Sequence, residues 1–223
     1  MRFGNIIRIM VGAALATKLF VGEAAYAQET YQQPDKKDKV ELNLGYNALE
    51  VAVTDKADVR TRALTNVDAT IGDRLTVGYH GLNEMDNADP SLYYGRHVIT
   101  AAPKDSQTSA AAVVKTDSAG VFDKKVGIRN TSLPEMLGSY GFIEVTANGD
   151  ATNLTAFYGR EVGPIIIEGY QDVDVPFKGK VSSYSELILT KSLDGKLSVF
   201  GRAEIPNNNP KETKGMIGFV FPF

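Results

Sequence analysis

Apolar and polar side chains alternate with a period of two along most of this chain. In the segment 39–53, for example, Val40, Leu42 and Leu44 alternate with Glu41 and Asn43. Successive side chains of a β-strand point to opposite faces, so the pattern predicts a sheet with one apolar and one wet face. No stretch longer than about two helical turns keeps apolar residues at three- and four-residue spacing. We therefore predict an all-β chain.

The alternation changes phase once within that first segment. The apolar residues Leu49, Val51 and Val53 stand on the opposite face from Tyr46 if the strand is regular. An extra residue in one strand of an antiparallel pair produces such a switch. The sequence thus predicts a bulge or a strand end near Ala48.

Turn residues divide the chain into short segments. Gly72-Asp73, Asn148-Gly149-Asp150, Gly163-Pro164 and Asp194-Gly195 are typical of tight turns. The predicted strands are 39–53, 59–71, 74–83, 92–102, 109–116, 121–129, 139–147, 152–161, 164–173, 182–191, 195–205 and 215–223. That number is twelve, with ten or eight as alternatives if the ambiguous stretch 92–130 forms loops.

The amino terminus has the layout of a signal peptide. Arg2 and Arg8 precede an apolar run, and Ala25 and Ala27 supply the small residues that a signal peptidase requires. We expect cleavage after Ala27, so that residues 1–27 are removed, 28–38 form a polar flexible lead-in, and 39–223 form the folded domain.

Composition excludes several kinds of site. The chain has no cysteine and only two histidines, which rules out disulfides and thiolate metal sites and disfavours a histidine metal centre. Removal of residues 1–27 takes three of 24 basic and one of 27 acidic residues, leaving 21 against 26 and a net charge of −5. This charge disfavours nucleic acid as a partner. No Ser/His/Asp spacing or nucleophile elbow is present, so we expect neither catalytic residues nor a cofactor.

The last predicted strand carries the most specific pattern. Ile217, Phe219, Phe221 and Phe223 share one face in strict alternation, and Met216, Gly218 and Val220 share the other. Pro222 is a departure from this pattern, because proline lacks a backbone donor for strand pairing. This ending, with the signal peptide and the alternating body, resembles the bacterial outer-membrane β-barrel proteins. No subfamily is identified, although twelve strands are similar in topology to the nucleoside-specific outer-membrane channels.

The resemblance implies an antiparallel up-and-down transmembrane β-barrel located in a bacterial outer membrane. Its partners would be outer-membrane lipid and the barrel-assembly machinery, which recognises the terminal strand Ile217, Phe219, Phe221 and Phe223. Both chain ends of such a barrel lie in the periplasm. Long and short connections alternate mostly as that orientation requires.

Charged residues are expected on the inner face. If Leu187, Leu197, Ile143 and Val145 face lipid, the residues pointing inward are Glu144, Glu186, Arg202 and Glu204, joined by Glu168 and Arg160 if Ile165 and Ile167 also face out. Such residues form either a structural ion-pair network or a selectivity-setting ring along a solute path. Tyr140, Phe157 and other aromatic residues near strand ends suit interfacial girdles.

Three functions stay open from the sequence. The first is a small passive, porin-like channel for hydrophilic solutes, and the second is a closed outer-membrane barrel with a structural or adhesive role. The third is a soluble secreted β-barrel that carries an apolar ligand, with its apolar face turned inward. The two membrane alternatives are favoured, and the channel slightly over the closed barrel.

Overall fold

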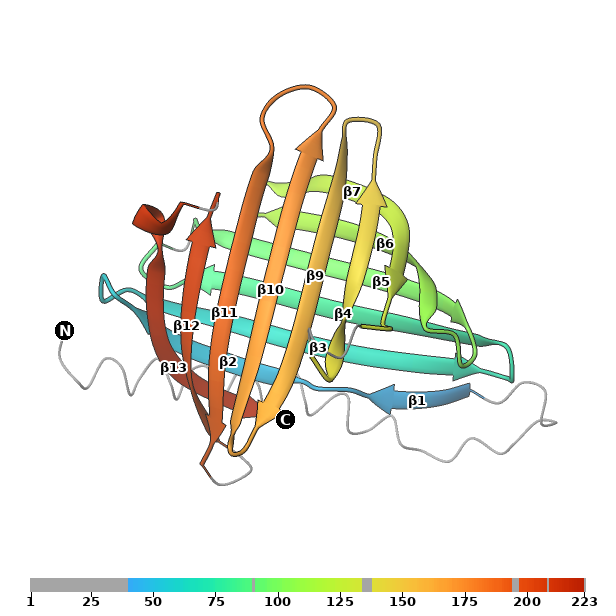
Figure 1. Ribbon diagram of the computed structural model, residues 1–223, viewed down its shortest axis with the longest axis horizontal. Coiled ribbons are helices and arrows are strands. Elements are labelled where there is room, and N and C mark those ends of the chain that lie inside the picture. Colours follow the sequence, from blue (N-terminus) through green and yellow to red (C-terminus); the bar gives the residue numbers. More distant parts are fainter. Residues whose placement is uncertain (1–39, 90, 134–137, 194–196, 208, 223) are drawn as a thin grey trace. The chain divides into compact units, whose positions relative to one another are not determined.

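The computed structural model describes residues 40–89, 91–133, 138–193, 197–207 and 209–222 (Figure 1). The predicted signal peptide with Ala25 and Ala27, the lead-in 28–38, and Phe223 lie outside the described residues. Within the described residues no helix is long and apolar enough to cross a membrane.

The described chain consists of thirteen β-strands and one short 3-10 helix, η2 (Pro210–Glu212). The strands are β1 (Val40–Leu44), β2 (Ala48–Thr54), β3 (Val59–Ile71), β4 (Leu75–Asp86), β5 (Tyr93–Pro103), β6 (Thr108–Asp117), β7 (Gly120–Asn130), β8 (Tyr140–Ala147), β9 (Ala151–Val162), β10 (Ile165–Pro176), β11 (Ser182–Ser192), β12 (Ser198–Pro206) and β13 (Lys214–Pro222).

The strands close into a barrel. Each strand from β3 to β12 pairs with the next along the chain, and β13 pairs with β2, which pairs with β3. All pairings are antiparallel, and the ring comprises β2 to β13. In Figure 1 strands β9 to β13 cross in front of strands β3 to β6. The predicted all-β barrel of twelve strands is confirmed, and the ambiguous stretch 92–130 forms the strands β5, β6 and β7, with a register shift between Lys115 and Thr116 in the pairing of β6 with β7.

The thirteenth strand, β1, continues β2 on the same side of β3. Leu44 pairs with Val67 and Ala48 pairs with Leu64, so the three residues 45–47 face only Thr65 and Asn66. This is the predicted bulge. The extra residue keeps the apolar side chains of both β1 and β2 on one side of the sheet.

Side chains of Asn47 and Asn66 stabilise this bulge. The Asn47 Oδ1 accepts a hydrogen bond from the backbone N–H of Asn66 at 2.9 Å, and Asn47 Nδ2 donates to the Gly45 carbonyl at 2.9 Å. Asn66 Nδ2 donates to the carbonyl of Tyr46 at 2.9 Å. Backbone groups that lose ladder partners at the bulge therefore keep hydrogen bonds.

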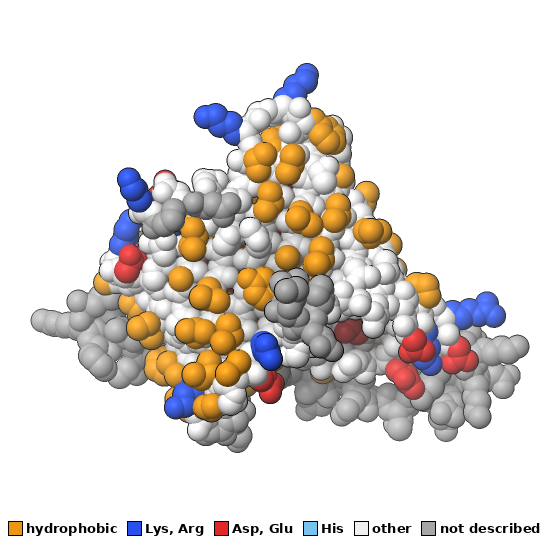
Figure 2. Space-filling model, viewed as in Figure 1, with side chains coloured by type: hydrophobic (Ala, Val, Ile, Leu, Met, Phe, Trp, Pro, Cys, Tyr) orange, Lys and Arg blue, Asp and Glu red, His pale blue; other side chains and the backbone are white. Residues whose placement is uncertain are grey.

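The outer face of the barrel is apolar. Large hydrophobic side chains in mid-strand are exposed on it, such as Leu187 (47%), Val126 (68%) and Ile217 (70%). Figure 2 shows apolar side chains spread over the face made by β9 to β13, with charged side chains mostly at its edges. Among the described residues the inner face holds only small apolar clusters, of which the larger contains Ala48, Ala52, Phe200, Met216 and Val220.

The two ends of the barrel are distinguished by their connections. Because neighbouring strands are antiparallel, the connections 87–92, 177–181 and 207–213 lie at one end, which we call the loop end. Strand β13 finishes and β2 begins at the opposite end, which we call the terminal end. The connections 72–74 and 163–164 also lie there.

Candidate functional site

Buried charged side chains fill much of the barrel interior, and they form three clusters. Each cluster joins strands that are not neighbours in the sheet, so its side chains reach across the lumen. Strand alternation places them there, because they occupy every second position on strands whose other positions face outward.

The first cluster lies against strands β2, β3, β4, β11 and β12. Its members are Arg60, Arg62 and Arg202 with Glu50, Glu84, Asp86, Glu186 and Glu204. Arg62 is central: its Nη1 lies 2.9 Å from Glu186 Oε1 and its Nη2 lies 2.7 Å from Glu84 Oε2. Arg60 Nη1 lies 3.2 Å from Glu204 Oε2. Arginine suits this role because its planar guanidinium donates to several carboxylates at once.

The second cluster consists of Arg96 on β5, Arg129 on β7 and Glu144 on β8. Glu144 is fully buried, and its two oxygens accept hydrogen bonds from Arg96 Nη2 at 2.5 Å and Arg129 Nη2 at 2.8 Å. The Arg129 guanidinium also lies 4.0 Å from the centre of the Phe142 ring. A buried carboxylate needs such partners, since an uncompensated charge inside a protein is strongly destabilising.

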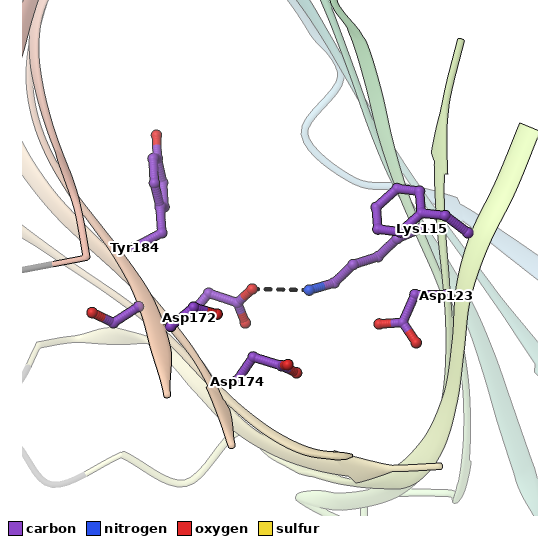
Figure 3. Close-up of a pocket in the computed structure, with 8 residues that line it drawn as sticks. Lys115, Asp123, Asp172, Asp174 and Tyr184 are labelled. Carbon is purple, nitrogen blue, oxygen red and sulfur yellow. Dashed lines mark hydrogen bonds and ion pairs between the residues drawn. The ribbon is translucent and has the colours of Figure 1, made fainter. Parts of the chain in front are cut away.

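The third cluster consists of Lys115, Lys125, Asp123, Asp172 and Asp174, and all of these except Lys125 line a cavity of about 270 Å³ near the loop end (Figure 3). Lys115 reaches from β6 to Asp172 on β10, with Nζ 3.0 Å from Oδ2. Lys125 Nζ lies 2.7 Å from both Asp123 Oδ2 and Asp174 Oδ1. Figure 3 shows Lys115 and Asp123 on one wall of the cavity and Asp172, Asp174 and Tyr184 on the opposite wall.

Buried hydroxyl and amide groups hold Asp172 in place. Thr155 Oγ1 donates to Asp172 Oδ1 at 2.7 Å, and Asn153 Nδ2 donates to the same oxygen at 2.9 Å. Both partners are fully buried on β9. The carboxylate is thus fixed by three donors, Lys115 included, and this part of the inner wall is rigid.

Most of the predicted inward-facing residues lie inside the barrel. Glu144, Glu186, Arg202 and Glu204 are buried members of the first two clusters. Glu168 is half-buried and accepts a hydrogen bond from the hydroxyl of Tyr140 at 2.9 Å.

Arg160 is placed differently from the sequence prediction. It is exposed and pairs directly with Ile167, so it lies on the outer face while Glu168 lies on the inner face. The physical reason is the two-residue turn 163–164, which pairs Val162 with Ile165 and so puts Arg160 opposite Ile167. Directly paired residues share a face of the sheet.

The predicted terminal strand is present as β13. Ile217 (70% exposed), Phe219 (40%) and Phe221 point outward, and Met216, Gly218 and Val220 point inward. Pro222 still takes part in the pairing with β2, opposite Ala48.

Tyr140, Phe157 and Tyr170, which were expected at the interfaces, instead stack inside the barrel on Phe142 and on Tyr184, which was expected to face the lumen. The rings of Tyr140 and Phe157 are 6.0 Å apart, and those of Phe142 and Phe157 are 5.9 Å apart. Tyr170 and Tyr184 pack edge to face at 6.2 Å. The inner wall is therefore aromatic as well as charged.

The sequence-based list of inner charges missed most of the basic partners. The sequence did contain a signal for Arg60 and Arg62, because both fall on the polar face of the predicted segment 59–71. Lys115, Lys125 and Arg129 lie in the stretch where the alternation was ambiguous. Among the described residues no group of three or more His, Cys, Asp or Glu is arranged to hold a metal ion.

Comparison with known proteins gives only structural likenesses. No family model matches the chain, and no curated protein sequence matches it. A mutant form of the Rh. blastica porin is 12% identical, with 83% of this chain and 100% of that chain covered and a TM-score of 0.43. A porin refined at 1.8 Å resolution is 14% identical, with 87% and 66% covered and a TM-score of 0.30. The assignment of the fold rests on the strand pairing of this chain itself.

Proposed function

We propose that this chain is an integral outer-membrane barrel that forms a narrow, porin-like passive channel for small hydrophilic solutes. The observation that carries the proposal is the reversed polarity of the barrel. Leu187 and Leu189 on β11 are exposed, while Glu186 on the same strand is buried in an ion-pair network. A water-soluble barrel has the opposite arrangement.

The exposed apolar face supports a lipid environment. Burying a leucine or isoleucine side chain contributes roughly 1.5 to 3 kcal/mol, so a wall of such residues is unfavourable in water and favourable in hydrocarbon. In the closed ring every strand from β2 to β13 pairs with a neighbour on both sides, as a membrane-spanning sheet requires. The predicted signal peptide and the terminal strand direct the proposal to the bacterial outer membrane.

In this orientation the terminal end faces the periplasm and the loop end faces outward. Outer-membrane lipid would cover the apolar face, and the barrel-assembly machinery would recognise β13 through Ile217, Phe219 and Phe221. These two partners, and the proposed lack of catalytic activity, stay predictions.

The polar interior supports a path for solutes. Barrels of about eight strands are filled by side chains, whereas wider barrels enclose ligand cavities or channels. The twelve-stranded ring holds charged groups along its inner wall and a cavity at the loop end. Such a wall would favour water, ions and small hydrophilic solutes.

Reconstitution tests the proposal in two steps. The mature protein should need detergent for extraction and should migrate differently on gels before and after heating, as closed membrane barrels do. Inserted into a planar bilayer, it should produce discrete single-channel currents. A mature protein that is soluble without detergent would contradict the membrane assignment.

A closed barrel with a structural or adhesive role is the second candidate, and one specific observation favours it. Arg62 on β3 and Glu186 on β11 form an ion pair across the lumen, and both are buried. Along the barrel wall their strands are separated by β2, β13 and β12. If the barrel is closed, it will be heat-modifiable but silent in bilayers across many insertions. A carrier of apolar ligands fits less well, because the described part of the interior holds only small apolar clusters.

A further inference from the structure

The charges of the three clusters do not balance. The first cluster has five carboxylates and three guanidinium groups, the second has one carboxylate and two guanidinium groups, and the third has three carboxylates and two ammonium groups. Together they hold nine acidic and seven basic residues. Glu168, which has a tyrosine hydroxyl as its partner, adds another carboxylate. These groups of the inner wall therefore carry a net charge of −3 when all are ionised.

Part of this excess negative charge lies near the loop end, where a solute that enters from that side would meet it first. Asp86 is the last residue of β4, and Asp174 lies two residues before the end of β10, so both stand close to the loop end. Glu84, whose side chain is 19% exposed, is the most exposed acid of the first cluster, and Asp174, at 33%, is the most exposed acid of the third. Their basic partners Arg62 and Lys125 are more buried, at 10% and 4%. The carboxylates are therefore the more accessible members of these pairs.

We infer that the barrel selects small cations over anions. The inference rests on the proposed channel function and names its solute class. Inside a lumen with low-dielectric walls, fixed charges of one sign raise the local concentration of ions of the opposite sign. The seven basic residues do not reverse this effect, because the ten carboxylates, Glu168 included, outnumber them.

The cavity near the loop end is suited to the same class of solute. Lys115 and Lys125 already place ammonium groups on Asp172, Asp123 and Asp174 at 2.7 to 3.0 Å. The geometry of these carboxylates therefore suits an ammonium group as a hydrogen-bond donor. Potassium and methylammonium are the probes that follow.

The reversal potential in a KCl gradient across a planar bilayer tests the inference. The wild-type protein should be more permeable to K⁺ than to Cl⁻. The double variant Glu84→Gln with Asp174→Asn removes two negative charges from the inner wall. At about 8 Å in water each charge changes the local concentrations of K⁺ and Cl⁻ about twofold in opposite directions, so the permeability ratio should fall about fourfold per charge and about sixteenfold in the double variant.

Two further variants separate charge from structural damage. Arg60→Gln removes a partly exposed guanidinium and should raise the ratio, the opposite direction from the double variant. Asp73→Asn, at the 72–74 turn of the terminal end and 91% exposed, should leave the ratio unchanged. Each variant is first checked for heat-modifiable migration, so that only closed barrels are compared.

The possible outcomes are distinct. Currents with a preference for Cl⁻, or a ratio that the double variant leaves unchanged, would overturn cation selectivity and leave the channel intact. The absence of currents from a correctly closed barrel would contradict the proposed channel and this inference together. Methylammonium carrying current in place of K⁺ would support the inference.

Discussion

Arg62 and Glu186 are joined by two hydrogen bonds, from Nη1 to Oε1 at 2.9 Å and from Nη2 to Oε2 at 3.2 Å, although their strands lie on different parts of the barrel wall. Along the ring, β2, β13 and β12 separate β3 from β11. This bidentate pair fixes the distance between two walls in a way that backbone pairing does not. It also crosses the proposed solute path.

Breaking this pair should destabilise the barrel. Replacing either residue by alanine leaves the other charge buried and should lower the free energy of unfolding by about 3 kcal/mol. The double variant Arg62→Ala with Glu186→Ala should lose less than the sum of the single variants. Urea-induced unfolding of the refolded protein in lipid vesicles measures the three values. Asp73→Ala, which removes an exposed ion pair with Lys104, is the control and should have no measurable effect.

The seam between β13 and β2 should not tolerate a side chain at Gly218. A Cβ at this position would meet the carbonyl oxygen of Val51 and lie 2.7 Å from the Cα of Ala52. Gly218→Val should therefore weaken closure of the ring, by at least about 1 to 3 kcal/mol. The fraction of heat-modifiable protein after refolding measures closure. Gly201→Val is the matched control, because a Cβ there meets no atom within 4 Å. Equal refolding of the two variants would show that the seam is looser than described.

A charge on the outer face should be costly only if lipid covers it. Leu187→Arg, in mid-strand on β11, should destabilise the barrel in lipid vesicles by about 2 to 4 kcal/mol. Val181→Arg is the control, because Val181 is also exposed but lies in the 177–181 connection. Reversible unfolding in vesicles gives both values. If the two substitutions cost the same, the apolar wall does not face hydrocarbon.

The bulge between β1 and β2 should depend on Asn47. Asn47→Ala removes a buried acceptor and donor, leaving the N–H of Asn66 without that partner, and should cost about 1 to 3 kcal/mol. The exposed Asn43 on β1 is the matched control, since Asn43→Ala should be close to neutral. Thermal unfolding followed by the loss of β-sheet circular dichroism compares the two. A neutral effect of Asn47→Ala would mean that water replaces its hydrogen bonds.

The wall of the barrel was accessible from sequence because alternation is a local property. Val40, Leu42 and Leu44 reveal their face within five residues, and the phase change near Ala48 was visible for the same reason. Burial of the inner charges followed from the same alternation once the outer face was assigned.

The partners of the inner charges were not accessible, because they are set by how strands far apart in sequence face each other across the lumen. Nothing near Arg62 indicates Glu186, 124 residues away. Arg160 shows a subtler limit: its face depends on the register across the 163–164 turn, and a strand-by-strand pattern does not contain that register. The two-residue length of the turn was the clue that would have placed it.

The one extra residue among Gly45, Tyr46 and Asn47 decides which face of the sheet each side chain of β1 occupies relative to β2. Deleting any one of the three would force either β1 or β2 to exchange its two faces, whereas a deletion compensated by an insertion nearby would restore both. An insertion or deletion of odd length within β1 or β2 should therefore disrupt the pairing with β3 unless a second change nearby compensates it.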